Sequence, residues 1–551
     1  MKKLLLLLIC IPLASQELAD VLWGKSKLAS PYHYSEITNS IINIPTEGKS
    51  FKAILKVNKP PLGIGHTVLT DDNGIHLKDF EYLPNFEIEI ISQDGYLYSI
   101  NNEIIETDHP YWNIQFGTGT SKLEKESNNT VLAIPFSLIH KSANCTHNGV
   151  GIFSISQTNS ISNIVFQVAS ETCAYYKFDH VSIYSSELEF TDSSIDIIKN
   201  DKSKNENILS IENLYEMHDL DDQSFINSNF IDPSHVTLFG IIDNNNHYTS
   251  SCITRLGDYP FCDQILLPSY SLAKSIAGTL TLALIEESFG TISDIPIASI
   301  VPECNDRKWA NVTIENLSDM TTGQYFNSIH DYDESSIASS QVIFILESHK
   351  DKLKKACTAF PKKTRAGKRF VYHTSDTYIL GTAFNNLLNK KSEKVDYFND
   401  VLTPYLQENN LSQASKSVLR TYDNNKQAFT GWGMFFLRSD IFYLSKLIHT
   451  VKANPLSNLN YLHEALNPNE DISFKAIPSV NIFYNNGFWS RKFDKSFFGC
   501  SDDVWIPFMS GFGGITLAFF PNGMTYYYFS DGYEFAWESA IFSSHKIKPF
   551  C

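Results

Sequence analysis

Apolar and polar positions in the first part of the chain follow the short-range pattern of β-strands. Segments such as Phe86–Ile91, Gly151–Ile155 and Asn163–Val168 alternate apolar with polar residues or form short apolar runs. Polar turn clusters at residues 71–74 and 144–149 separate such segments, and no convincing helical stripe interrupts them. The pattern predicts a β-sandwich domain over residues 20–185.

The pattern changes twice further along the chain. Residues 186–234 are polar and poor in structure-forming residues, most clearly at 199–207, and we predict a polar linker there. From Val236 onward, short strand-like segments are followed by strongly helical ones and then by strands again. This order predicts an α+β domain over residues 235–551, with a sheet built from distant parts of the chain.

The first residues have the pattern of an export signal. Lysines at positions 2 and 3 precede an apolar run over residues 4–13, and Ala14 and Ser15 follow. We therefore predict a signal peptide at residues 1–15 and a secreted or periplasmic protein. The run is shorter than the roughly 20 residues that span a bilayer, so we predict no transmembrane segment. The alternative is that the run belongs to the mature fold as a strand or helix.

Cysteine usage agrees with export. Of nine cysteines, Cys10 lies in the predicted signal, which leaves an even set of eight. Such a set in an exported chain indicates disulfides, and proximity in sequence favours the pairs Cys145–Cys173 and Cys252–Cys262. The cysteines show neither Cys-x-x-Cys spacing nor an accompanying His-x-x-x-His, so we predict no metal site. We find no cofactor motif either.

Composition excludes one class of partner. A hydrophobic content of 43% is typical of a globular protein. The formal net charge is -17 and the chain has no long basic run. Because nucleic-acid binding draws much of its affinity from Lys and Arg, we predict no nucleic-acid partner.

The first candidate for chemistry is the pair Ser271 and Lys274. An apolar stripe runs through the segment that follows, and Gly290 supplies a stop signal. Ser271 is therefore expected in the first turn of a buried helix, with Lys274 one turn further on the same face. A lysine at this spacing can reach the serine hydroxyl, and burial can lower its pKa enough for it to act as a base. The stripe consists of Leu272, Ile276, Leu280, Ala283 and Leu284.

The Ser-x-x-Lys spacing is a weak signal when it stands alone. Ser543 and Lys546 have the same spacing in a polar C-terminal segment. A helix N-cap serine followed by a solvated lysine would be the favoured interpretation of either pair without further evidence.

Further segments, in a fixed order, supply that evidence. Together they resemble the serine β-lactamase and penicillin-recognising family, especially its class C-like branch with DD-peptidases, esterases and 6-aminohexanoate-oligomer hydrolases. The resemblance covers about residues 236–535. It implies a β-lactamase/transpeptidase-like fold, with an antiparallel sheet flanked by helices plus a helical subdomain. The segments are Leu267–Ile276, Trp309–Leu317 with Met320–Gly323, Gly367–Thr374 with Leu380–Gly381, Gly431–Asp440, and Met509–Gly514 followed by Leu517–Pro521.

The resemblance also implies roles for individual residues. Ser271 would attack a carbonyl carbon and form an acyl-enzyme, while Lys274 and Tyr372 would share the proton transfers; which of these two takes the first proton stays open. The backbone N–H groups of Ser271 and Phe512 would form the oxyanion hole. The predicted substrate-binding residues are Thr374, Ser510 and Gly511.

Two positions depart from the family pattern. Thr374 stands where the family has asparagine, and it keeps a hydroxyl but lacks the amide. Met509 stands where the family has a lysine or histidine that helps to hold a substrate carboxylate, and methionine cannot do this. The departures favour a small-molecule or peptide-like ester or amide substrate without an essential carboxylate.

Three functions are therefore compared. The favoured one is an exported serine hydrolase that works through a Ser271 acyl-enzyme. The second is a catalytically silent protein that binds a ligand or cell-wall component on the same fold. The third is a DD-peptidase or β-lactamase in which Lys368 or Arg369 supplies the missing cation.

Overall fold

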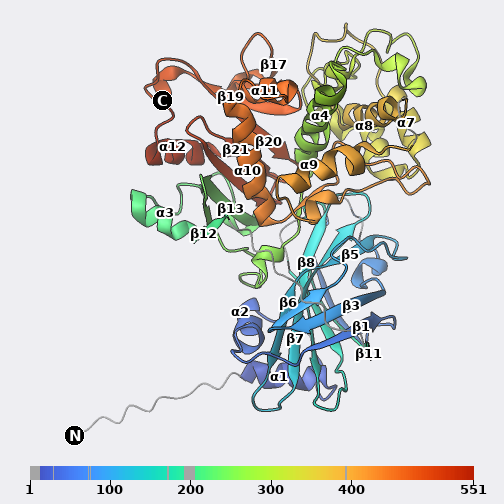
Figure 1. Ribbon diagram of the computed structural model, residues 1–551, viewed down its shortest axis with the longest axis vertical. Helices are drawn as coiled ribbons and strands as arrows, with labels where there is room; N and C mark the ends of the chain where they lie inside the picture. The colour runs from blue at the N-terminus through green and yellow to red at the C-terminus, as the bar shows by residue number, and fades with distance from the viewer. Residues whose placement is uncertain are drawn as a thin grey trace. The chain divides into compact units, whose positions relative to one another are not determined.

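The computed structural model describes residues 13–551 except 29, 72–73, 75, 170–172, 192–204 and 391–393. The predicted signal peptide, residues 1–15, therefore lies almost entirely outside the described residues. The chain forms two compact units (Figure 1). The first contains residues 1–139, 146–200 and 251–265, and the second contains residues 140–145, 201–250 and 266–551.

The first unit is built on one antiparallel sheet of eleven described strands. Their order is β11-β1-β3-β4-β6-β7-β8-β9-β10-β2, with β5 paired to β7. Two short helices, α1 (Leu13–Leu22) and α2 (Tyr34–Ile37), precede the sheet in sequence. The strands are β1 (Phe51–Val57), β2 (Gly63–Thr70), β3 (Phe86–Gln93), β4 (Tyr96–Ser99), β5 (Trp112–Phe116), β6 (Gly119–Leu123), β7 (Thr130–His140), β8 (Thr146–Ile155), β9 (Ile164–Val168), β10 (Lys177–Tyr184) and β11 (Glu187–Phe190).

This sheet curls around its own core. Phe86 in β3 and Phe166 in β9 have ring centroids 5.8 Å apart, although β4, β6, β7 and β8 separate their strands in the sheet. Neighbouring strands lie about 4.8 Å apart, so a flat sheet would keep these rings roughly 24 Å from each other. The predicted N-terminal β-domain is thus confirmed, with both of its layers belonging to one continuous sheet.

The second unit contains a nine-stranded sheet among its described residues. The order is β12-β14-β13-β22-β21-β20-β19-β18-β17, antiparallel except for the pair β12 and β14. It joins residues 236–249 to residues 474–530, as predicted from the strand–helix–strand order. The strands are β12 (Asn207–Ser210), β13 (Val236–Asp243), β14 (Asn246–Thr249), β17 (Phe474–Ile477), β18 (Ile482–Asn485), β19 (Phe488–Phe493), β20 (Val504–Gly511), β21 (Ile515–Phe519) and β22 (Met524–Ser530).

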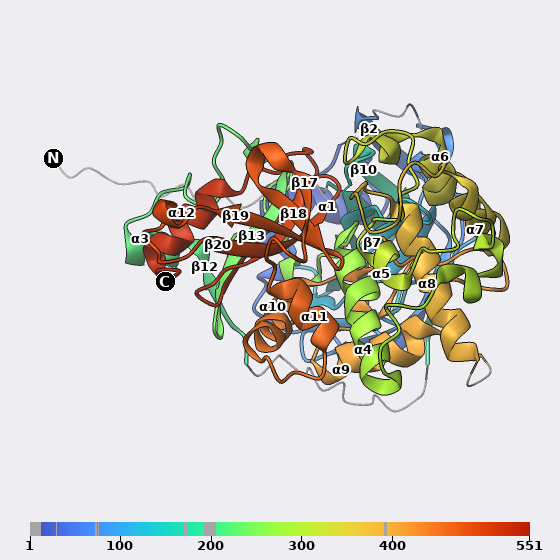
Figure 2. The same ribbon diagram turned by 90° about the horizontal axis from the view of Figure 1, so that it is seen from above.

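Helices flank this sheet. Helices α3 (Ile211–His218) and α12 (Glu538–Ile547) share one hydrophobic cluster with β13, β20 and β22, whereas α10 (Arg438–Ala453) contacts β21 (Figure 2). A helical subdomain lies beside the sheet, and the predicted α+β fold class is confirmed. The other helices of this unit are α4 (Thr281–Phe289), α5 (Ile314–Ser318), α6 (Ile337–Ser340), α7 (His349–Thr358), α8 (Thr374–Asn389), α9 (Thr403–Glu408) and α11 (Asn460–Leu466).

The polar linker predicted at residues 186–234 is corrected where this stretch is described. It contributes β11 to the first sheet, β12 to the second, and helix α3. Ile211, Leu214 and Tyr215 are buried in the second core because they lie on one face of α3. The polar residues around this short stripe hid it from the sequence pattern.

Disulfides close loops in both units. Cys252–Cys262 is present as predicted, together with Cys304–Cys357 and Cys500–Cys551. Cys145 and Cys173 are also disulfide-bonded. Among the described residues, no helix is both long and apolar enough to cross a membrane.

Loop length predicts which disulfide matters more for stability. Replacing Cys304 and Cys357 together by serine removes a closure over 53 residues and should lower the free energy of unfolding by about 4 kcal/mol. The matched double variant at Cys252 and Cys262 opens a separation of only 10 residues and should cost about 3 kcal/mol. Urea unfolding of both variants measures the difference. An equal or reversed order would contradict the loop-closure explanation.

Candidate active site

Ser271 lies in a tight turn at the start of a buried helix. The turn follows the two-residue strand β15 (Leu267–Pro268), and the helical segment η5 (Lys274–Leu280) leads directly into α4. Leu272 and Ile276 are fully buried, whereas Ser271 is partly exposed. The helix ends at Gly290, as the sequence predicts. The structure thus places a partly exposed Ser271 at the start of a buried helix, as expected from the sequence.

Lys274 is buried and points at Ser271. Its Nζ atom lies 2.9 Å from Ser271 Oγ, 3.0 Å from Thr374 Oγ1 and 3.0 Å from the carbonyl oxygen of Gly431. Burial lowers the pKa of Lys274 to about 8, and the nearby carboxylate of Glu334 opposes this shift. An amine with such a pKa is partly neutral near physiological pH and can accept a proton.

The ring of Tyr372 lies beside the Lys274 amine. Its ring centroid is 4.9 Å from Lys274 Nζ, and the ring stacks on Trp489 of β19. Burial raises the pKa of Tyr372 above its ordinary value, and the Glu334 charge adds to the rise. A hydrogen bond with Ser271 opposes it. Ser271, Lys274 and Tyr372, chosen from the sequence, therefore come together.

Thr374 connects Lys274 to a carboxylate that the sequence motifs did not single out. Its hydroxyl accepts from Lys274 and donates to Glu334 Oε1, while its backbone N–H donates to Glu334 Oε2 at 3.0 Å. Glu334 comes from a short turn, η8 (Tyr332–Ser335), forty residues before Thr374. Where the family motif has an asparagine amide, this chain thus has a threonine hydroxyl that links Lys274 to a carboxylate through hydrogen bonds.

His373 fixes the segment between Tyr372 and Thr374. It is buried, lies 3.1 Å from Asp333 and 3.7 Å from Asp376, and stacks on Phe360 at 4.0 Å between ring centroids. Burial alone would lower the pKa of His373, but its contacts with Asp333 and Asp376 raise it to about 9. A charged histidine held by two carboxylates keeps the backbone of this segment in place.

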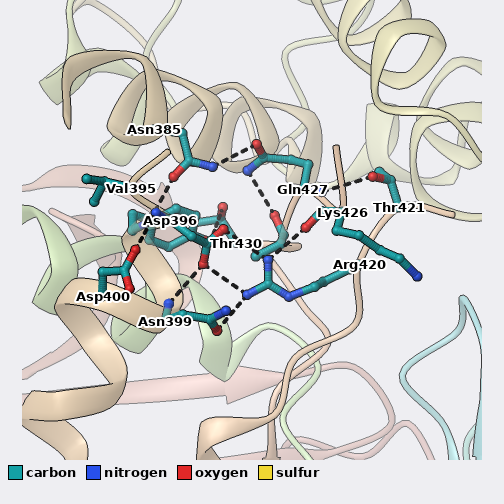
Figure 3. Close-up of polar contacts among 12 residues, drawn as sticks. Asn385, Val395, Asp396, Asn399, Asp400, Arg420, Thr421, Lys426, Gln427 and Thr430 are labelled. Carbon is teal, nitrogen blue, oxygen red and sulfur yellow. Dashed lines mark hydrogen bonds and ion pairs between the residues drawn. The ribbon is translucent and has the colours of Figure 1, made fainter. Parts of the chain in front are cut away.

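A polar network includes Thr430, the residue before Gly431, whose carbonyl receives Lys274 (Figure 3). Arg420 binds Asp396 through two hydrogen bonds of 3.0 Å, and the hydroxyls of Thr430 and Tyr397 lie 2.9 Å apart. Space is tight here, because a Cβ atom on Gly431 would collide with Thr377 Oγ1. The glycine motif predicted from the sequence is thus explained by close packing around Lys274.

The end of strand β20 lies close to the turn that carries Ser271. A Cβ atom on Gly511 would lie 2.8 Å from Leu272 and 3.0 Å from the carbonyl oxygen of Ser269. The ring of Phe512 is 40% exposed and makes an edge contact with Tyr270 at 6.0 Å. This strand end therefore places the Gly511–Phe512 backbone beside the turn that carries Ser271.

The other two positions on β20 differ in exposure. Met509 is fully buried and Ser510 is partly exposed. Within the described residues, no polar contact joins Ser510 to Ser271, Lys274 or Tyr372. Lys368 and Arg369, the cations considered for a carboxylate-binding role, are both exposed.

Asn144 is a second residue that sequence reasoning missed. Its side chain accepts from the backbone N–H of Tyr270, the residue before Ser271, at 2.6 Å. The two residues are 126 positions apart, and Asn144 sits in what the sequence shows only as a polar turn cluster. No local pattern could have connected them.

No family model matches the sequence, and no curated protein matches it. Solved structures do match. A protein named as a 6-aminohexanoate-dimer hydrolase from Bacillus anthracis is 16% identical, with 58% of this chain and 80% of that chain covered and a TM-score of 0.42. A class C β-lactamase is 15% identical over 61% of this chain and 93% of that chain, with a TM-score of 0.40.

A D-stereospecific amidohydrolase from Streptomyces sp. is 13% identical over 56% of this chain and 93% of that chain, with a TM-score of 0.39. The roles proposed below rest on the geometry around Ser271.

Proposed function

We propose that the protein is an exported serine hydrolase that cleaves an ester or amide through an acyl-enzyme on Ser271. The observation that carries this proposal is the buried Lys274 amine 2.9 Å from the Ser271 hydroxyl. A serine hydroxyl becomes a useful nucleophile only when a neighbouring base takes its proton. A buried amine with a lowered pKa is such a base.

Lys274 is the better candidate for the first proton acceptor. Burial lowers the pKa of Lys274 to about 8 and raises that of Tyr372. Near neutral pH the amine therefore loses its proton far more readily than the phenol does. Once neutral, it keeps two N–H groups for Thr374 and the Gly431 carbonyl, and its lone pair can face the Ser271 hydroxyl.

The reaction then proceeds in two halves. Ser271 Oγ bonds to the substrate carbonyl carbon as Lys274 takes the hydroxyl proton, and the bond to the leaving alcohol or amine breaks. Tyr372, next to both groups, passes a proton to the leaving atom and is reprotonated by Lys274. Water then attacks the acyl-enzyme by the same route and releases the acid.

The backbone N–H groups of Ser271 and Phe512 are proposed to bind the oxyanion. Each such donor contributes about 3 kcal/mol to stabilising the transition state in comparable sites. The close approach of Gly511 to the nucleophile turn supports this role for the neighbouring Phe512 N–H. Thr374, Ser510 and Gly511 stay the proposed substrate-binding positions.

A neutral acyl group suits the site best. The family's carboxylate-binding position is Met509, which is buried and uncharged. Glu334 adds a negative charge next to Lys274, which would repel a substrate carboxylate. The substrate is therefore proposed to be a small or peptide-like ester or amide without an essential carboxylate.

A fluorophosphonate probe tests for the acyl-enzyme chemistry. Wild-type protein should form one covalent adduct, on Ser271, while Ser271→Ala should form none and Lys274→Ala should react at least about a hundredfold more slowly. Mass spectrometry of the labelled peptide measures the outcome.

Ser543→Ala is the matched control. Ser543 has the same spacing to a lysine, but its hydroxyl donates to the Ser224 carbonyl and Lys546 binds the Asp219 carbonyl. This variant should label like wild type. A wild-type protein that stays unlabelled would favour the silent binding protein, and turnover of penicillin in preference to short-chain esters would favour the β-lactamase alternative.

The pH dependence tests the choice of base. With an uncharged ester, kcat/KM should rise with pH and level off above about 8, because neutral Lys274 is the reactive form and burial sets its pKa near that value. Initial rates measured between about pH 5.5 and about pH 9.5 define the curve, because this range extends about 2.5 units below that pKa. A rate that falls through the same range would instead make the ammonium the required form and Tyr372 the first base.

The charge of Glu334 should affect the pH dependence of kcat/KM. Its charge raises the pKa of Lys274, so Glu334→Gln should move the acidic limb of kcat/KM to lower pH by about one unit. A role limited to holding the fold would lower the rate without moving the limb.

Thr374 supplies the matched pair for this experiment. Thr374→Ser keeps the hydroxyl that links Lys274 to Glu334 and should retain most of the activity. Thr374→Val removes that hydroxyl and should lower kcat by at least about tenfold. Equal effects of the two substitutions would exclude the hydroxyl relay.

A further inference from the structure

The loop between β7 and β8, residues 141–145, belongs to the second unit together with His140, the last residue of β7. The rest of both strands belongs to the first unit. Two contacts hold the loop there: Tyr422 Oη donates to the Lys141 carbonyl at 2.6 Å, and Trp432 Nε1 donates to the Ser142 carbonyl at 3.2 Å. The loop is thus a structural part of the unit that contains Ser271.

Asn144 lies near the C-terminal end of this loop, just before β8, and is completely buried. Its backbone has a φ of +49°, in the left-handed region that asparagine tolerates better than most residues. Its side-chain oxygen accepts from Tyr270 N–H at 2.6 Å and Gly433 N–H at 2.9 Å, and its amide donates to the Met434 carbonyl at 3.1 Å. An asparagine side chain offers both an acceptor and donors, and this site uses both.

The Ser269 hydroxyl joins the same network. It lies 3.1 Å from Asn144 Oδ1 and 3.0 Å from the Tyr270 carbonyl oxygen, and it accepts from the Met434 N–H at 3.1 Å. Ser269 N–H also donates to the Met434 carbonyl at 2.9 Å. Asn144 is therefore at the centre of a buried connection between the turn before Ser271 and the segment at residues 433–434.

Both of these segments matter for the chemistry. Tyr270 has a φ of +40°, a left-handed conformation that is strained for a side chain of this size, and it directly precedes Ser271. Such a conformation persists only when its surroundings hold it. Gly433 follows Gly431, whose carbonyl receives Lys274 Nζ, by two residues. The Asn144 side chain thus restrains both the backbone next to Ser271 and the backbone near the carbonyl group that binds Lys274.

We propose that Asn144 is a positioning residue that holds Ser271 and Lys274 in reactive alignment. It acts through Tyr270 and Gly433 and does not touch the reacting atoms. The loop between β7 and β8 would then have a defined task, which is to complete the active site with one buried amide. The inference rests on the proposed acyl-enzyme function for its kinetic consequence, while its structural half stands independently.

Variants at Asn144 test the kinetic half with the full-length protein. Asn144→Ala removes all the side-chain contacts and should slow fluorophosphonate acylation of Ser271 at least about tenfold. Asn144→Asp keeps the acceptor for Tyr270 and Gly433 but loses the donor to Met434, so its rate should lie between those of Asn144→Ala and wild type. Tyr422→Phe, which removes a loop contact without touching Asn144, should react like wild type.

The decisive readout separates the rate from the final extent of labelling. Misplaced reactive groups lower the rate constant while every molecule still becomes labelled. A role in folding alone would lower the labelled fraction and leave the rate of the folded molecules unchanged, and that result would overturn the proposal. Should Asn144→Ala not fold, Asn144→Asp carries the test, and a wild-type rate for it would equally overturn the proposal.

Hydrogen–deuterium exchange tests the structural half without any activity. The Tyr270 amide should exchange faster in Asn144→Ala, or in Asn144→Asp if only that variant folds, than in wild type and Tyr422→Phe. One outcome is that wild-type protein is not labelled while the Tyr270 amide exchanges faster in the variant. That outcome would refute the proposed function but keep the role of the Asn144–Tyr270 hydrogen bond in holding the turn. Unchanged exchange, with normal wild-type labelling, would refute the role of Asn144 and keep the proposed function.

Discussion

The site depends on one buried amine and the oxygen atoms around it. Lys274 is enclosed by hydroxyl and carbonyl groups from the nucleophile turn, helix α8 and the segment at Gly431. Burial penalises its charge, while the nearby Glu334 carboxylate favours it. These opposing effects leave the amine close to the point where it can gain or lose a proton near neutral pH. The packing here is tight, because a Cβ atom on Gly431 would collide with Thr377 and lie 3.4 Å from Lys274 Nζ.

The parts of the site that could be predicted are those that depend on residues close together in the sequence. Ser271 and Lys274 are three residues apart, and a buried helical stripe follows them, so their contact follows from helix geometry. Tyr372 and Thr374 were found because their segment resembles a family motif. The strand–helix–strand order of the second unit was enough to predict a sheet assembled from distant segments, which the pairing of β13 with β22 confirms.

The parts that could not be predicted depend on tertiary contacts. Glu334 lies in a short polar turn forty residues from Thr374, and Asn144 lies 126 residues from Tyr270. Single polar residues in loops carry no periodicity, so the sequence gives no reason to select them over their neighbours. Helix α3 was missed for a related reason, because three apolar residues in a polar stretch form too weak a stripe.

The pairing of β13 with β22 also affects the order in which the protein can fold. β13 begins at Val236 and its partner strand ends at Ser530, close to the end of the chain. This part of the sheet therefore forms only once residue 530 is available, whereas the β21–β22 hairpin needs only neighbouring residues. Contacts between residues so far apart in sequence form more slowly than local ones, because a long loop must close first. The β13–β22 pairing therefore makes completion of the sheet a late, non-local step of folding.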